Sequence, residues 1–256
     1  MGGVFDRLDA WMVALVLAAV MITAWRLGWR SGRALHARGE DPSLGKLDDA
    51  SIALLGLLLA FSFSMALGKH DRRREMVVAD SNAIGDFYTC ASLLPDPVRS
   101  ELQKVIREYT EHRLELVRRR ALLEEKLDQE LRRMYEMQGR MTDLVARAVN
   151  QGTPVAVPLT NTLNGLTSNH AARLAAIEDR LPPTIVATLF FASIVATALV
   201  GRNQGASPHP RLTGTLTFVI LVTLVIYVTL DLNQPYRGLI EVSQAPMERV
   251  LRSMTR

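Results

Sequence analysis

The feature that most constrains this chain is an uncharged run from Ser51 to Gly68 that leads directly into a charged segment. At about 1.5 Å per residue, a helix over this run crosses most of the ~30 Å hydrocarbon core of a bilayer. Neither Gly nor Pro occurs between Gly68 and Gly85. The sequence therefore predicts one helix that crosses the membrane and continues into water as a stalk.

Three further apolar runs have the length and composition of membrane spans. Trp25, Arg26 and Trp29 close the first run, and such residues suit the membrane–water interface. Pro182 and Pro183 precede the third run, where a helix is expected to restart. The sequence predicts an all-α fold with four transmembrane spans near residues 10–28, 51–68, 184–200 and 212–230.

The segment 69–182 is polar and is predicted to be a helical domain outside the membrane. Pro95 and Pro97 end the stalk. Residues 98–150 have no proline and recurrent apolar residues at steps of three, four and seven, which predicts one long amphipathic helix or two end to end. Gly139 is the expected bend, and residues 160–181 are expected to form a return helix. The apolar stripe then needs cover from the return helix, the stalk or a neighbouring subunit.

These predictions divide the chain into four parts. Residues 1–68 carry the first two spans, 69–182 the extramembrane helical domain, 183–230 the last two spans, and 231–256 a tail. Four spans place both ends of the chain and the 69–182 domain on the same side of the membrane. Lys and Arg flank the spans in nearly equal numbers on both sides, so the positive-inside rule does not decide the orientation.

Several classes of chemistry find no support in the sequence. Cys90 is the single cysteine, so no internal disulfide is expected. The five histidines fall in no metal-binding spacing, and no phosphate-binding loop or nucleophile motif occurs. The formal net charge of +4 comes without a basic cluster interleaved with aromatics, which argues against nucleic-acid binding. We therefore expect neither an enzyme nor a cofactor.

Two blocks of sequence carry a family resemblance. The first is LLLAFSFSMALGKHDRRRE followed by SNAIG at residues 81–85, and the second combines DLNQP at 231–235, Gly238 and VSQAPM at 242–247. This pattern resembles the bestrophin-like membrane proteins, relatives of the bestrophin channels. The resemblance implies a homo-oligomer, a pentamer with the second helix innermost. The first span alone, with Arg7 before it and four arginines just after it, favours termini outside, whereas the resemblance implies that the termini and the helical domain are cytoplasmic. The expected location is the plasma (inner) membrane.

Two functions remain open from the sequence. The first is an oligomeric channel or pore for small inorganic ions, because one four-span subunit cannot enclose a pathway alone. The alternative is a membrane-anchored helical scaffold or sensor that binds a protein partner and does not conduct. Both have the lipid bilayer as a partner.

A candidate pore surface follows from helical spacing in the second span. Leu54, Leu57, Phe61 and Met65 share one face, with Ser64 and Gly68 beside it. If this face lines a pore, Phe61 is the expected constriction. Charge at the mouth is expected from Arg72, Arg73, Arg74 and Glu75, with Arg72 and Arg73 favouring anions. The alternative is that the stripe packs against the first and fourth helices of the same chain.

The tail supplies a second candidate site. Asp231, Asn233, Gln234 and Arg237 belong to the second resembling block. We expect them to dock on the stalk near residues 72–75 and Asn82, with Asp231 paired to one of the stalk arginines.

Overall fold

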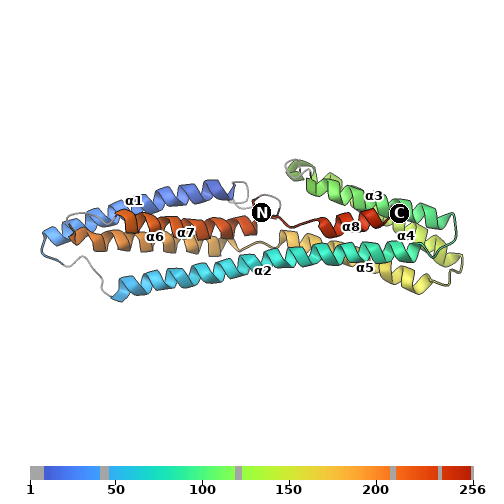
Figure 1. The fold of residues 1–256 in the computed structure, drawn as a ribbon, viewed down its shortest axis with the longest axis horizontal. Helices are drawn as coiled ribbons and strands as arrows, with labels where there is room; N and C mark the ends of the chain where they lie inside the picture. The colour runs from blue at the N-terminus through green and yellow to red at the C-terminus, as the bar shows by residue number, and fades with distance from the viewer. Residues whose placement is uncertain (1–8, 41–45, 119–122, 208–211, 236–237, 255–256) are drawn as a thin grey trace. The chain divides into compact units, whose positions relative to one another are not determined.

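The computed structural model describes residues 9–40, 46–118, 123–207, 212–235 and 238–254, and the secondary structure in these ranges is helical without a strand (Figure 1). The chain divides into two compact units. Unit 1 contains residues 1–70 and 180–240, and unit 2 contains residues 71–179 and 241–256. The predicted all-α fold class is confirmed.

Unit 1 is built from long apolar helices. Its elements are α1 (Ala10–Ala37), the first part of α2 (Lys46–Ala91), α6 (Pro183–Asn203), the short 3₁₀ helix η3 (Gln204–Ala206) and α7 (Leu212–Asn233). Within the described residues, four helical segments are long and apolar enough to cross a membrane, and they contain the four predicted spans. Their shared core consists of Leu17, Met21, Leu55, Ala196, Val219, Val222 and Ile226.

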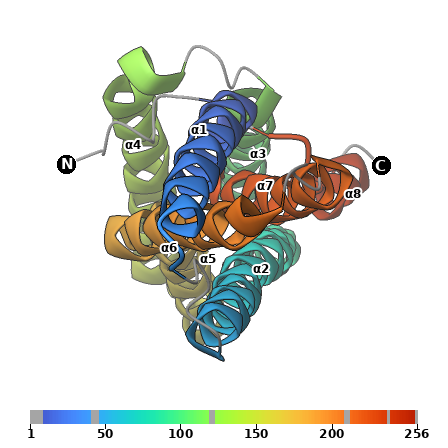
Figure 2. The ribbon, with the colours of Figure 1, turned by 90° about the vertical axis from the view of Figure 1, so that its left-hand side faces the viewer.

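Glycines bring α1 and α6 into direct backbone contact, and these helices run side by side in both ribbon views (Figures 1 and 2). A Cβ on Gly28 would lie 2.1 Å from the carbonyl oxygen of Ala198, and one on Gly201 would lie 2.2 Å from that of Trp25. Gly32 and Gly205 are equally crowded. Two small-xxx-small motifs therefore pack against each other within one chain, which is how such motifs bring membrane helices together.

Unit 2 is a helical bundle with its own core. It contains the second part of α2, α3 (Val98–Arg118), α4 (Leu123–Asn150), α5 (Ala156–Glu178) and α8 (Ala245–Ser253). Core residues that are at most 1% exposed come from all five helices: Ile84, Phe87, Ala91, Leu102, Ile106, Tyr109, Met141, Leu159, Leu166 and Met247. The apolar stripes of α3 and α4 are thus covered within unit 2 itself.

The expectation of a single long helix, or two helices end to end, over residues 98–150 is wrong. α3 and α4 run antiparallel, since Arg147 on α4 pairs with Glu101 near the start of α3 at 3.1 Å. Gly139 lies inside the uninterrupted helix α4 and is not a bend. Folding back lets each apolar stripe bury against the other helix, whereas one extended helix would leave most of its stripe in water.

The last described helix lies against the stalk part of α2. Tyr88 donates a hydrogen bond from its hydroxyl to the carbonyl oxygen of Met254 at 3.1 Å, and Ser81 Oγ lies 4.0 Å from Met247 Sδ. Both methionines are buried in the unit 2 core. Segments far apart in sequence therefore complete one hydrophobic core.

Candidate functional site

The candidate pore stripe lies on an exposed face of α2. Leu54, Leu57, Phe61 and Met65 are 56%, 52%, 61% and 43% exposed. Ser64 and Gly68 are exposed as well, whereas the core-facing side of the helix carries Leu55, Ser62 and Ala66. The alternative in which the stripe packs against the chain's own helices is wrong. The stripe is left for lipid, another copy of the chain or a pathway.

Of the arginines beyond Gly68, Arg72 continues this exposed face and Arg73 does not. Arg73 is only 4% exposed, so it points away from the stripe. Arg72 is exposed but lies 3.3 Å from Glu75, which offsets its charge. The expectation that Arg72 and Arg73 together form a positive mouth therefore does not fit the structure. Arg74, like Arg72 and Glu75, is exposed to solvent.

Acidic and polar side chains continue the exposed face along α2. At about 100° per residue, Asp71, Glu75, Asn82 and Asp86 fall within roughly 80° of Phe61 around the helix. All four are exposed. Within this angular range the exposed face therefore carries three carboxylates and two basic groups, Arg72 and the partly exposed Lys69.

A buried ion cluster occupies the interior of unit 2. Asp80, which is fully buried, accepts from Arg113 on α3 and from Arg173 on α5, with nitrogen–oxygen distances of 2.8 and 2.9 Å. Arg173 also donates to Gln244 Oε1 at 2.9 Å, just before α8. The cluster therefore ties together four segments of the bundle. Charge-assisted bonds of this kind are the strong ones in a protein interior.

His170 on α5 and Tyr109 on α3 complete the cluster. Arg113 Nη1 lies 2.8 Å from His170 Nδ1 and donates to the Tyr109 hydroxyl at 2.7 Å. Since a guanidinium only donates, Nδ1 must accept and the ring proton lies on Nε2. The rings of Tyr109 and Tyr135 meet the imidazole edge-on.

The cluster shifts the pKa values of its neutral members. Burial, together with the positive charges of Arg113 and Arg173, lowers the pKa of His170 from 6.5 to about 4, although Asp80 opposes the shift. Burial likewise raises the pKa of Tyr109. His170 is therefore neutral at pH 7, and the cluster is a set of fixed charges that hold the helices in register.

Sequence reasoning missed this cluster, although a signal was present. Arg113 follows Ile106 and Tyr109 at helical spacing, and His170 and Arg173 follow Leu166 in the same way. A charged residue in register with an apolar stripe has to be buried and therefore has to be paired.

The described tail residues form hydrogen bonds within unit 1. Both carboxylate oxygens of Asp231 accept the backbone N–H of Leu239, at 3.0 and 3.1 Å, and Oδ2 accepts that of Ile240 at 2.9 Å. Asn233 Oδ1 accepts the N–H of Leu181 at 2.7 Å. Gln234 donates its backbone N–H to the carbonyl of Asp231 at 3.1 Å. Arg237 lies outside the described residues. The Asp231 carboxylate therefore caps the turn that follows α7, and its expected pairing with a stalk arginine stays a prediction.

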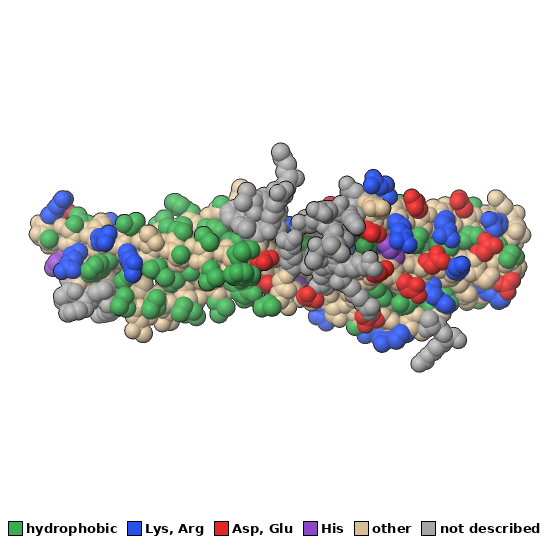
Figure 3. Space-filling view, turned by 90° about the horizontal axis from the view of Figure 1, so that it is seen from above, with side chains coloured by type: hydrophobic (Ala, Val, Ile, Leu, Met, Phe, Trp, Pro, Cys, Tyr) green, Lys and Arg blue, Asp and Glu red, His purple; other side chains and the backbone are tan. Residues whose placement is uncertain are grey.

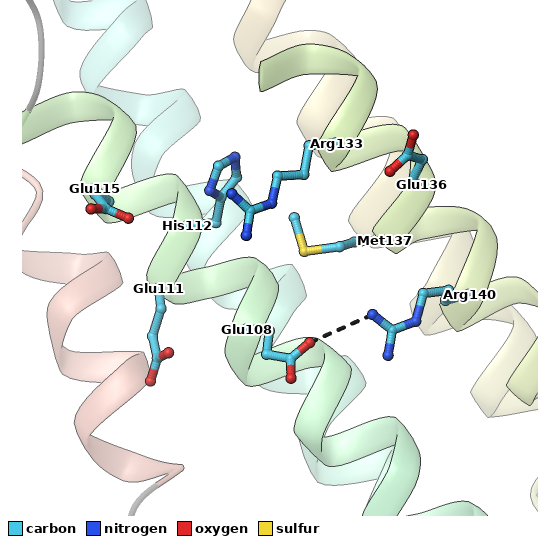
Figure 4. Close-up of a pocket in the computed structure, with 8 residues that line it drawn as sticks. All are labelled: Glu108, Glu111, His112, Glu115, Arg133, Glu136, Met137 and Arg140. Carbon is cyan, nitrogen blue, oxygen red and sulfur yellow. Dashed lines mark ion pairs between the residues drawn. The ribbon is translucent and has the colours of Figure 1, made fainter. Parts of the chain in front are cut away.

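A surface hollow of about 300 Å³ lies between α3 and α4 (Figure 4). Arg140 reaches Glu108 across it at 3.6 Å, and His112 Nε2 lies 3.0 Å from Glu130. Burial lowers the pKa of His112 despite that carboxylate. The residues that line the hollow are Glu108, Glu111, His112, Glu115, Arg133, Glu136, Met137 and Arg140. Within the described residues no group of three or more His, Cys, Asp or Glu side chains is arranged to hold a metal ion. The hollow is a solvated ion-pair groove.

The fold and the exposed face of α2 define a four-span helical membrane protein with a helical bundle. The family model described as the Bestrophin-like domain matches residues 50–247. The chain therefore belongs to the bestrophin-like family, as the sequence blocks predicted.

Comparison with solved structures supports the same fold. A bacterial bestrophin homologue from Klebsiella pneumoniae, crystallised as a variant with one tryptophan changed to alanine, matches 99% of this chain and 98% of its own, with a TM-score of 0.74. Sequence identity is 10%, so this likeness shows the fold alone. A comparison with curated proteins finds no match.

Proposed function

We propose that this protein is an ion channel built from several copies of the chain, with α2 lining the pathway. The observation that carries the proposal is the exposed stripe Leu54, Leu57, Phe61 and Met65, which the chain's own helices leave uncovered. In α2, 17% of the most apolar window is buried, against 33% or 39% in the other three candidate spans. A helix this exposed fits the centre of a ring better than the centre of one subunit. The pentamer implied by the resemblance is the proposed assembly.

The proposed permeant ions are small cations. Asp71, Glu75 and Asp86 outnumber the basic Lys69 and Arg72 on the exposed face, and Arg73 is buried. Repetition around a ring would multiply this negative excess. Acidic rings select for cations, and the field is screened over about 8–10 Å in physiological salt.

The proposed location is the plasma (inner) membrane, with unit 2 and both ends of the chain in the cytoplasm. The family resemblance supports this orientation. The Lys and Arg residues that flank the spans are nearly balanced and do not decide it. A cysteine introduced at Thr153, in unit 2, tests this orientation. An impermeant maleimide added to intact cells should not label it if unit 2 is cytoplasmic. Cys90 is buried and should not react in the parent protein. Labelling of the new cysteine without cell lysis would contradict the proposed orientation.

Planar-bilayer recording of the purified protein tests the channel itself. Unitary currents are expected, and Phe61→Ala should change conductance or open probability. Leu67→Ala is the matched control, because Leu67 is also exposed but lies about 120° around α2 from Phe61. A closed assembly that never conducts would favour the scaffold. Conductance and gating unchanged by Phe61→Ala would remove Phe61 from the pathway.

Reversal potentials in a KCl gradient test the sign of the permeant ion. We expect a cation-selective potential, and Glu75→Gln together with Asp86→Asn should move it toward zero. Asp96→Asn, an exposed carboxylate in the turn before α3, is the control and should leave it unchanged. An anion-selective potential in the parent channel would contradict the proposed selectivity but not the pore.

A further inference from the structure

The C-terminal part of α1 carries a stripe of arginines whose direction is fixed by the opposite side of the helix. Arg26, Arg30 and Arg33 follow one another at four and three residues, so they share a face. All three are exposed. Gly28 and Gly32 lie roughly 140° around the helix and pack on the backbone of α6. Because the glycine face is held against α6, the arginine face must point outward from unit 1.

The stripe begins where the apolar surface of α1 ends. Leu15, Val16 and Val20 are 61%, 65% and 42% exposed on the same helix, and Leu27 is 60% exposed. From Arg26 to Arg33 the helix rises about 10 Å, and the headgroup layer of a leaflet is roughly 5–8 Å thick. The three guanidiniums therefore span the depth at which lipid phosphates lie. Figure 3 shows Lys and Arg side chains gathered at this end of unit 1, beyond its hydrophobic surface.

Nothing among the described residues neutralises the stripe. No described carboxylate lies in ion-pair distance of Arg26, Arg30 or Arg33, and the Arg33 guanidinium instead stacks 5.3 Å from the ring centre of Trp29. A stacked guanidinium is held in one direction while its N–H groups stay available to an acceptor. Trp29 also belongs to the residue type that prefers the interface.

We propose that Arg26, Arg30 and Arg33 form a binding surface for the phosphate groups of anionic phospholipids. Guanidinium binds phosphate with two parallel hydrogen bonds, and anionic headgroups also attract basic side chains electrostatically. The surface is a property of one subunit. It is independent of whether α2 lines a conducting pathway.

Thermal unfolding of the purified protein in neutral detergent tests the surface. Short-chain phosphatidylglycerol should raise Tm, and phosphatidylcholine of the same chain length should not. For the triple variant Arg26→Gln, Arg30→Gln, Arg33→Gln, the phosphatidylglycerol concentration at half of the maximal shift should rise on the order of 100-fold. The triple Arg→Lys variant should keep most of the effect, because it keeps the charge.

Matched controls separate the lipid surface from net charge and from free anions. The variant Arg132→Gln, Arg133→Gln, Arg249→Gln removes three exposed arginines of unit 2 and should respond as the parent does. If the α1 triple variant does not fold, Arg30→Gln alone should raise the half-maximal concentration about 5-fold. Equal shifts by both lipids, an unchanged α1 variant, or a shift reproduced by inorganic phosphate alone would each overturn the proposal.

Discussion

The Asp80 carboxylate binds both terminal nitrogens of the Arg113 guanidinium, with Nη1 3.2 Å from Oδ1 and Nη2 2.8 Å from Oδ2. Arg173 approaches the same Oδ2 at 2.9 Å, so one buried carboxylate serves two guanidiniums on different helices. The arrangement makes Asp80 the common point of α2, α3 and α5. Its removal would leave two buried cations without their shared counter-charge.

We therefore expect Asp80→Asn to be among the most destabilising single changes in unit 2. Breaking a buried ion pair by removing one partner costs about 3–5 kcal/mol. The measurement is Tm of the purified protein in detergent. Glu75→Gln is the control, since the Arg72–Glu75 pair is exposed and such pairs are worth about 0–1 kcal/mol. Similar Tm values for the two variants would show that the cluster does not hold the bundle together.

The stability of unit 2 should fall as the pH is lowered. The pKa of His170 is about 4 in the folded protein and 6.5 in the unfolded chain, so the unfolded chain binds the proton first. Stability is therefore lost as the pH falls from 6.5 toward 4, by an amount on the order of 3 kcal/mol. The lowered pKa of His112 adds to the loss in the same direction.

The variant His170→Gln tests this pH dependence. It keeps an acceptor for Arg113 but cannot take up the proton, so its Tm should depend less than that of the parent on pH between about 7 and 4. His36→Gln, at an exposed histidine of α1, should leave the parent dependence in place. Parallel Tm curves for the parent and His170→Gln would assign the acid sensitivity to other groups.

The glycine contact between α1 and α6 should tolerate no added methyl group. In Gly201→Ala the new Cβ would meet the Trp25 carbonyl oxygen at 2.2 Å, so the helices must move apart. Overpacking of this kind costs about 1–3 kcal/mol. Gly139→Ala is the control, because that glycine is helical with nothing within 4 Å, and it should stabilise α4 by up to about 1 kcal/mol. Equal Tm values for the two variants would argue against the tight contact.

The turn after α7 should depend on Asp231. Asp231→Ala removes the acceptor of the Leu239 and Ile240 N–H groups, and each such bond to a charged group is worth about 1.5–3 kcal/mol. Gly238→Ala should act similarly, because Gly238 has a φ of 134° and its Cβ would lie 2.7 Å from Asp231 Oδ1. Limited proteolysis near residue 238 should become faster in both variants. Unchanged cleavage would show that the turn does not need the carboxylate.

The sequence predicts the spans well because apolar length is a local property. The fourth predicted span, 212–230, falls within α7, and the third, 184–200, within α6. Which helix covers an apolar stripe depends on residues far away in the sequence, and the predicted arrangement of residues 98–150 is wrong for this reason. Periodicity over 98–150 shows that a stripe must be buried but not where the chain turns back, since residues 119–122 contain neither Gly nor Pro.

Directions of side chains were predicted less well than helices. Arg72 and Arg73 are neighbours, and a helix turns about 100° between them, so both cannot face one pathway. The structure buries Arg73 and exposes Arg72. The Asp80 cluster was missed for a related reason, because its members lie about 30–90 residues apart and meet only through folding.

The core of unit 2 has a consequence for biosynthesis. Met247 and Met254 are buried with residues from α2, α3, α4 and α5, although α6 and α7 are synthesised between. At about 5–20 residues per second, roughly 3–14 s separate the synthesis of Asp179 from that of Met247. During that interval the bundle lacks part of its core while two spans are being inserted. The core of the bundle therefore cannot be complete before α8 has been synthesised, and a chain stalled before Ala245 would leave part of the apolar surface uncovered.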